Sequence, residues 1–209
     1  MNLFKHTFLP ILFLSLSFSV QAEQTAEQRL TVALKSLDSI QAFFEQMVIN
    51  DNNQVIQQSK GSLAIQRPGK FNWTYTTPYE QQIIADGKEI WIYDVDLQQA
   101  SVKSQDASMD KTPIMVLMNS KSLSADFNIN EIGQKKHLYW VELTPKTEGG
   151  QFQRLYFGLK DNQIMAMDLR DTFGQSTQIT FSDHRYKVIH NPAKFTFIAT
   201  PDIDVFSSD

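Results

Sequence analysis

Apolar and polar positions alternate along much of the chain after residue 40, which is the pattern of half-buried β-strands. The clearest example is Phe71, Trp73 and Tyr75, three aromatic residues separated by single polar residues. Successive side chains of a strand point to opposite faces, so these aromatics are expected to share one face. Turn-forming residues separate four further runs that we predict as strands, at 137–143, 152–159, 163–170 and 176–186.

A hairpin is predicted between residues 83–85 and 90–93, two runs rich in isoleucine and aromatic residues that flank Asp86-Gly87. Both residues of this dipeptide tolerate positive φ, as a two-residue hairpin turn requires. Strand follows strand here without intervening helices, so parallel crossover units are not expected. The pattern therefore predicts an antiparallel, meandering sheet.

One amphipathic helix is predicted before the strands, at about residues 25–39. Thr25 and Gln28 have the spacing of a capping box, in which each side chain satisfies a backbone amide of the other residue. Apolar residues follow at helical intervals, at Leu30, Ala33, Leu34 and Leu37. We expect this apolar face to lie on the sheet.

A short apolar run interrupts the strand pattern at residues 114–118, which we call the lid segment. Thr112 and Pro113 form a helix start, because a capping hydroxyl precedes proline at the first helical position. The five residues that follow have no polar break: Ile114, Met115, Val116, Leu117 and Met118. A helical turn that is apolar on all sides is either buried or packed against something that comes and goes. Two roles stay open, a core helix that plugs the sheet or a mobile lid.

The first 22 residues have the features of an export signal. Lys5 precedes an apolar run at residues 8–20, and Val20-Gln21-Ala22 is a small-residue cleavage site. The run is shorter than the roughly 20 residues that a membrane-spanning helix needs. We expect cleavage after Ala22, a periplasmic location, and one domain formed by residues 23–209.

Composition narrows the function further. The whole chain has a formal net charge of −4, and loss of Lys5 with the signal makes the remainder more acidic. Nucleic acid is therefore not an expected partner, because no excess of basic residues exists to neutralise phosphates. The chain has no cysteine, which excludes disulfides, thiolate metal sites and a lipid on an N-terminal cysteine.

The sequence lacks the motifs of hydrolases and of phosphate or dinucleotide binders. His137, His184 and His190 do not have a metal-binding spacing. We therefore expect no enzyme activity, no cofactor and no metal. One alternative stays open, an acid pair that meets only in the folded protein, drawn from Asp94, Asp96, Asp168, Asp171 and Asp183.

Several blocks in order resemble the periplasmic outer-membrane lipoprotein carrier family, LolA. The first block runs from Arg67-Pro68-Gly69 through Asn72-Trp73, and the second covers the predicted hairpin to Asp94. Further blocks are Thr112-Pro113 with its apolar run, 143–146, 171–175 and 193–197. The resemblance spans nearly the whole chain after the signal.

The resemblance implies an α+β fold: an incomplete antiparallel β-barrel, with short helices forming a lid over a hydrophobic cavity. It also implies a route. An inner-membrane ABC transporter complex, LolCDE, would load the carrier with acylated lipoproteins, and an outer-membrane receptor, LolB, would receive them. The carrier would perform no chemistry itself.

Arg67 is the candidate latch of the lid, because the matching arginine of the family hydrogen-bonds backbone carbonyls of the lid region. Guanidinium has five donors and can hold several carbonyls, whereas a lysine ammonium is a point charge. A solvated arginine beside a proline turn is the alternative. The candidate cavity lining follows from the predicted helix and strand faces: Leu34, Leu37, Phe71, Trp73, Tyr75, Trp91, Met165 and Met167.

Phe71 is also a candidate contact for partner proteins, because it lies near a strand start beside a Pro-Gly turn. Two other functions stay open. The first is a periplasmic sensor or glycolipid-binding module of the same architecture, although such sensors usually have a second domain and a membrane anchor. The second is a hydrolase acting on an amphiphile.

Overall fold

The computed structural model describes residues 24–105, 117–118, 123–147 and 152–207. The predicted signal peptide lies outside these ranges. The helical segments are α1 (Ala26–Lys35), η1 (Ser36–Asp38), α3 (Leu123–Asp126) and η3 (Pro192–Phe195). The strands are β1 (Ser39–Ile49), β2 (Val55–Gln66), β3 (Lys70–Thr77), β4 (Gln81–Asp86), β5 (Glu89–Asp94), β6 (Gln99–Ser104), β7 (Phe127–Lys135), β8 (Leu138–Pro145), β9 (Phe152–Lys160), β10 (Gln163–Asp171), β11 (Ser176–Tyr186) and β12 (Asp204–Ser207).

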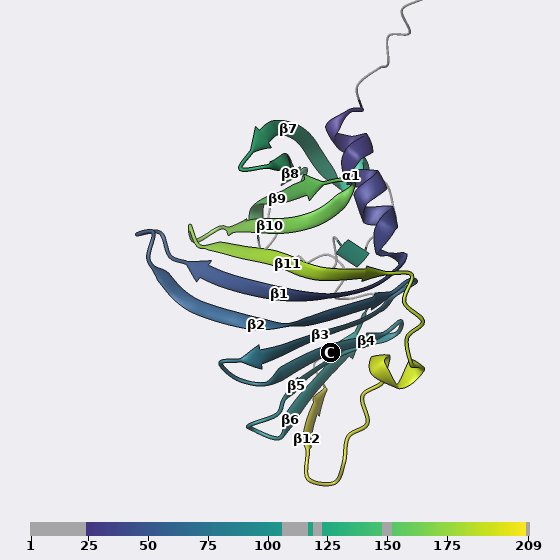
Figure 1. Cartoon of the computed structure of the whole chain (residues 1–209). Helices are drawn as coiled ribbons and strands as arrows, with labels where there is room; N and C mark the ends of the chain where they lie inside the picture. Colours follow the sequence, from purple (N-terminus) through teal and green to yellow (C-terminus); the bar gives the residue numbers. More distant parts are fainter. Residues whose placement is uncertain (1–23, 106–116, 119–122, 148–151, 208–209) are drawn as a thin grey trace, which may run out of the picture.

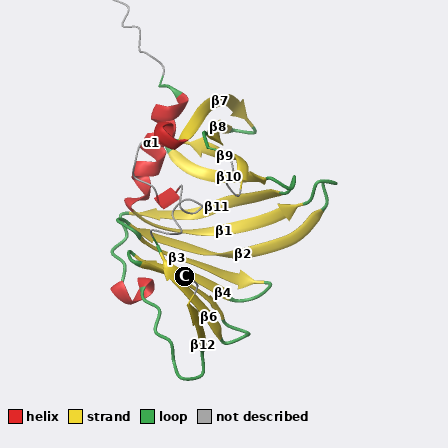
Figure 2. Cartoon of the chain, turned by 180° about the vertical axis from the view of Figure 1, so that it is seen from behind, coloured by secondary structure: helices red, strands yellow, loops and turns green. Residues whose placement is uncertain are grey.

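All described strands belong to one sheet with the order β12-β6-β5-β4-β3-β2-β1-β11-β10-β9-β8-β7. Two antiparallel meanders, β1 to β6 and β7 to β11, are joined where β1 pairs with β11. The sheet is strongly curved and not closed (Figure 1). Its strands converge at a narrow end near α1 and η3 and spread apart at a wide end (Figure 2).

The predicted helix forms at α1 with its capping box intact. The Gln28 amide donates to the Thr25 hydroxyl at 3.2 Å, and the Thr25 amide donates to the Gln28 side-chain oxygen at 3.0 Å. The helix ends at Lys35, and a 3₁₀ turn takes its place through Asp38. Contacts of α1 with β7, β8, β9 and β10 bury its apolar face on the sheet.

The predicted hairpin forms with β4 and β5, but its turn lies one residue later than predicted. The two residues between the strands are Gly87 and Lys88. Gly87 has φ +103°, a value that favours glycine. The Asp86 carboxylate accepts the amides of Lys88 and Glu89 at 2.7 and 2.9 Å, so Asp86 stabilises the turn from its first flank.

Gly61 allows the Phe44 ring to pack closely against the backbone of β2. A β-carbon at this position would stand 1.9 Å from the Thr74 carbonyl oxygen and 2.7 Å from the Phe44 ring. Any larger residue would therefore push the ring or the neighbouring strand away. The absence of a side chain at Gly61 leaves room for the Phe44 ring against β2.

The sheet is not wholly antiparallel as predicted, because the C-terminal segment adds one parallel strand. After β11 the chain crosses the outer face, where the Asn72 side-chain amide donates to the Lys194 carbonyl at 2.8 Å. It then adds β12 as an edge strand, and β12 runs parallel to β6. A long return across the sheet allows this parallel pairing, which a two-residue hairpin cannot produce.

Candidate functional site

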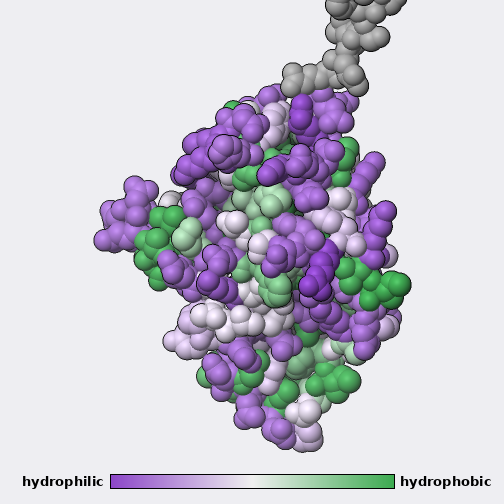
Figure 3. Space-filling view, viewed as in Figure 1, coloured by the Kyte–Doolittle hydropathy of each residue, from purple (hydrophilic) through white to green (hydrophobic). Residues whose placement is uncertain are grey.

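The concave side of the sheet and α1 enclose one apolar interior. The most deeply buried large side chains include Phe44, Phe71, Phe157, Leu30 and Ile65. Polar residues cover most of the molecular face in Figure 3, with separate apolar patches between them. The interior is thus the main apolar compartment of the described residues, and it is the candidate site.

Five of the predicted lining residues lie in this interior. They are Leu34 in α1, Leu37 in η1, Phe71 and Trp73 on β3, and Met167 on β10. Tyr75 is partly buried and packs against the same cluster. The Trp73 ring lies between Phe44, at a centroid distance of 4.3 Å, and Phe181, at 6.2 Å.

Trp91 was predicted to line the interior, and the structure places it on the opposite face. Its neighbours Ile90 and Ile92 face the core, so the pleat turns Trp91 outward. The Trp91 ring packs on Phe197 of the C-terminal segment, with 5.0 Å between centroids. The C-terminal segment thus forms a second apolar contact on the outer face of β5. Both faces of β5 are therefore covered, which explains why its sequence is apolar at successive positions.

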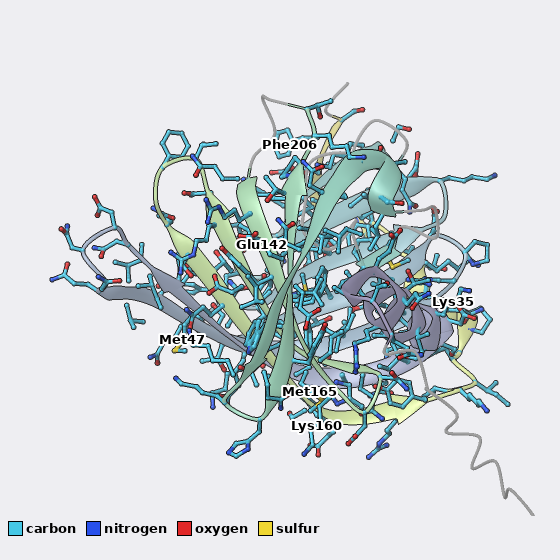
Figure 4. All side chains as sticks on the ribbon, turned by 90° about the horizontal axis from the view of Figure 1, so that it is seen from above. Lys35, Met47, Glu142, Lys160, Met165 and Phe206 are labelled. Carbon is cyan, nitrogen blue, oxygen red and sulfur yellow. The ribbon has the colours of Figure 1, made fainter. Side chains whose placement is uncertain are left out.

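Met165 is the second misplaced lining residue. The β9–β10 pairing shifts register between Ile164 and Ala166, which is a bulge centred on Met165. Ile164 and Met167 both belong to the core cluster as a result, and Met165 does not. Figure 4 shows Met165 close to Lys160, near the end of the β9–β10 hairpin. A bulge breaks the two-residue period on which the prediction depended.

The prediction that Phe71 contacts partners at the rim is wrong for this conformation. Its side chain is 0% exposed. Phe71 pairs with Ile65 on one side and Ala85 on the other, in the middle of the sheet rather than at its border. A buried ring of this kind contributes to the core and presents no surface to another protein.

The lid segment is partly described. Leu117 and Met118 are helical and buried, and both belong to the core cluster. Ile114, Met115 and Val116 lie outside the described residues. Leu117 borders a small void of about 10 Å³, which Leu37, Leu63, Ile164 and Phe181 also line. The protein's own side chains therefore fill this part of the interior.

Arg67 connects the β2–β3 turn to the lid segment. Its Nη2 donates to the Leu117 carbonyl oxygen at 2.5 Å. Its Nη1 lies 3.5 Å from an Asp38 carboxylate oxygen, and its side chain is only 10% exposed. The Arg67 backbone amide also donates to the Asp38 carbonyl at 2.8 Å. The solvated-arginine alternative does not describe this side chain.

Burial and charge act in opposite directions on this guanidinium. Burial lowers the pKa of Arg67, and the Asp38 carboxylate raises it by attraction and hydrogen bonding. Arginine stays charged in proteins because its ordinary pKa lies far above neutral pH. A charged donor at the Leu117 carbonyl makes a stronger hydrogen bond than a neutral one.

Gln105 is a polar contact that the sequence did not single out. Its side-chain amide donates to the Gly69 carbonyl at 2.9 Å, and its backbone amide donates to the Lys88 carbonyl at 2.8 Å. Gln105 therefore joins the end of β6 to the two turns beside Arg67. Nothing in its local sequence marks it, because both bonds depend on distant segments.

Three buried lining residues were also missed, namely Phe44, Leu63 and Phe181. Leu63 and Phe181 alternate with neighbouring core positions Ile65 and Ile179, a signal that the period of two could have revealed. Phe44 follows Phe43, so the pattern alone does not say which ring points inward.

The described residues offer little for metal chemistry or membrane spanning. Within these ranges, His, Cys, Asp and Glu side chains form no group of three that could hold a metal ion. No helix in the same part of the chain is long and apolar enough to cross a membrane.

The fold and its interior define a class of protein: an open, curved sheet that encloses an apolar compartment against one helix. A family model described as outer membrane lipoprotein carrier protein LolA matches residues 35–198. The chain belongs to the LolA family. The family and the fold class predicted from sequence are thereby confirmed.

Relatives agree with this family assignment, and one solved structure agrees with the fold. An outer-membrane lipoprotein carrier protein from Methylococcus capsulatus is 39% identical over 189 residues, covering 90% of this chain and 91% of the relative. One from Chromobacterium violaceum is 36% identical and covers 90% of each. A Thermus thermophilus protein of known structure has a TM-score of 0.59 at 13% identity, covering 88% of this chain and 100% of that one. At that identity the similarity shows the fold alone.

Proposed function

We propose that this protein carries lipoproteins through the periplasm by holding their acyl chains in the apolar interior. One observation supports this best: a buried, charged hydrogen bond from Arg67 holds Leu117 of the lid segment over that interior. A bond between two distant segments can break and re-form without unfolding either of them. The interior could then open for cargo and close when empty.

The free-energy cost of exposing the acyl chains of a lipoprotein to water makes such a carrier necessary. Three acyl chains have on the order of 40 methylenes, and exposing them to water costs roughly 30 kcal/mol at about 0.8 kcal/mol each. Free diffusion of an acylated protein is therefore negligible. A carrier must cover most of this surface and still release it, so its empty state needs its own apolar cover.

Leu117 and Met118 are the candidates for that cover, and their burial supports this role, with 2% and 5% of their surfaces exposed. Because these two buried side chains occupy part of the interior, acyl chains could enter that part only if the two side chains move away. The closed state and the loaded state then compete for the same space. Handover needs no covalent step, because closing of the lid segment helps to expel the chains.

We further propose that the chain is exported with cleavage after Ala22, is loaded by the LolCDE transporter complex and delivers to the LolB receptor. These partners follow from the family resemblance. The mature protein would begin at Glu23, just before the helix cap at Thr25. Mass spectrometry of the periplasmic protein should give this N-terminus, and an uncut chain in the membrane fraction would contradict it.

Mass spectrometry of the same preparation, purified without detergent, tests the cargo. We expect triacylated lipoproteins bound in a one-to-one complex. Recovery of a glycolipid instead would favour a different carrier, and hydrolysed acyl products would favour an amphiphile hydrolase. Adding purified receptor should empty the carrier if delivery is its function.

A further inference from the structure

The concave face changes from apolar to polar across five adjacent strands, in the direction from the narrow end to the wide end. Pairing across β1 to β5 aligns residues into rows that run across the sheet. The row nearest the narrow end is entirely apolar and consists of Ile40, Ile65, Phe71, Ala85 and Ile90. The second row is apolar as well and consists of Ala42, Leu63, Trp73, Ile83 and Ile92.

The third row is mixed, and beyond it the face is polar. This third row consists of Phe44, Gly61, Tyr75, Gln81 and Asp94. One step further toward the wide end, Gln46 pairs with Ser59. The side chains of one face thus form a gradient, with aromatic and aliphatic groups deep inside and amide, hydroxyl and carboxylate groups near the opening.

A hollow of about 460 Å³ lies at the polar end of this gradient, within the range of about 300–1,000 Å³ typical of ligand pockets. Tyr75 belongs both to the rim of the core and to the wall of the hollow. Its hydroxyl donates to the Gln46 side-chain oxygen at 3.2 Å. On β2, between the strands of these two residues, the Gln57 side-chain amide donates to the Ser59 hydroxyl at 3.3 Å. The hollow therefore adjoins the apolar interior at Tyr75.

We infer that this hollow, which we call the junction site, binds the uncharged polar junction of an acylated polypeptide. The junction consists of the ester and amide groups between the acyl chains and the first peptide bonds. This inference rests on the proposed function and adds where the cargo's polar part lies. It follows that the polypeptide leaves the carrier at the wide end of the sheet.

The chemistry of the wall fits such a group. Ester and amide carbonyls accept hydrogen bonds, and glutamine, serine and tyrosine side chains can donate them. Asp94 and Asp96, which also line the hollow, place negative charge beside it. A free fatty acid or an anionic phospholipid would bring a second negative charge, which is unfavourable at short range. The site should therefore prefer a neutral junction over a carboxylate or phosphate.

A second hollow, of about 710 Å³, lies between the start of α1 and β7. Its wall includes Glu27, Glu131 and Lys146, three charged side chains that a neutral ester or amide does not need. The row gradient described above does not lead to it. We therefore place the junction at the wide end and use the second hollow as the rival outcome.

Photocrosslinking locates the junction directly. The probe is a synthetic peptide with an N-palmitoyl, S-dipalmitoylglyceryl cysteine, followed by a benzophenone residue and uncharged residues. After irradiation of the full mature protein, we expect crosslinks within residues 57–59, 77–81 or 94–97. Crosslinks at 24–27 or 124–131 would overturn the junction site and leave the carrier function intact. Failure of the lipopeptide to bind would contradict the proposed function itself.

Selectivity gives a second test with matched variants. Gln81→Leu removes a polar wall group, and Gln82→Leu makes the same change on the outer face of the same strand. One lost hydrogen bond should weaken lipopeptide binding about two- to tenfold for Gln81→Leu and leave Gln82→Leu unchanged. Asp94→Asn keeps an oxygen for the Leu97 amide, which Asp94 accepts at 3.2 Å, and should strengthen palmitate binding several-fold. Equal effects of the two leucine variants, or palmitate binding unaffected by Asp94→Asn, would overturn the inference.

Discussion

Arg67 Nη2 lies 2.5 Å from the carbonyl oxygen of Leu117, a residue 50 positions further along the chain. The first belongs to the β2–β3 turn and the second to the lid segment. This contact links the sheet to the segment that we propose as the cover of its interior. Its loss should therefore change the balance between the closed and loaded states more than the stability of the sheet.

Arg67→Leu should fold, accept lipoprotein and release it poorly. Hydrogen bonds from charged groups contribute about 1.5–3 kcal/mol, so their loss would disfavour the closed state about ten- to a hundredfold. Transfer to purified receptor, followed by the amount of cargo left on the carrier, measures this effect. Lys70→Leu, on the strand beside the same turn, serves as control. Transfer at the normal rate by Arg67→Leu would remove the latch role, provided that thermal melting shows a folded protein.

Phe71→Glu should unfold the protein rather than disturb partner binding alone. Even Phe→Ala at a fully buried position costs about 3–5 kcal/mol, and a buried unpaired carboxylate adds to this cost. Urea unfolding followed by tryptophan fluorescence measures the loss. Phe173→Glu is the matched control, because Phe173 is 85% exposed and should tolerate the charge. A stable Phe71→Glu protein would show that the β3 interior opens easily.

Trp91 and Phe197 should fasten the C-terminal segment to the outer face of the sheet. Their ring contact is expected to contribute about 0.5–1.5 kcal/mol beyond the buried area, which a double-mutant cycle can isolate. Phe197→Ala should also speed hydrogen exchange at the β12 amides paired with β6. Unchanged exchange in β12 would mean that the strand pairing alone holds the segment.

Stability should decrease below about pH 6.5 because of His190. Burial lowers the pKa of this imidazole, and the Lys194 ammonium lowers it further. The unfolded chain then binds the proton more readily than the folded chain, so the free energy of unfolding falls as the pH drops from the ordinary histidine pKa toward the lowered one.

Urea unfolding at pH 7.5 and pH 5.0 measures this difference. His190→Gln should reduce the pH dependence, whereas His137→Asn, in the exposed β7–β8 turn, should retain it. If His190→Gln loses as much stability between pH 7.5 and pH 5.0 as the protein without the substitution, other groups cause the pH dependence.

Local patterns predicted most elements of the fold. The alternation around Phe71 and Trp73, the capping box at Thr25 and the turn at Asp86 all depend on residues within a few positions of each other. Each of these elements formed close to its predicted place. Register was less predictable, since the bulge at Met165 depends on how β10 pairs with β9.

By itself, the sequence determined the helix, the strands, the apolar character of the interior and the family, because these depend on short-range periodicity and on motifs in fixed order. Tertiary structure decided which face each large side chain occupies. Trp91 turned outward, where the C-terminal segment supplies apolar cover. Phe71 became inaccessible because its ring packs within the core cluster on the concave face. The tertiary structure also brought Arg67 to Leu117, and it aligned five strands so that their concave face changes from apolar to polar toward the wide end. Such contacts join residues tens of positions apart, and only the paired sheet fixes their distances.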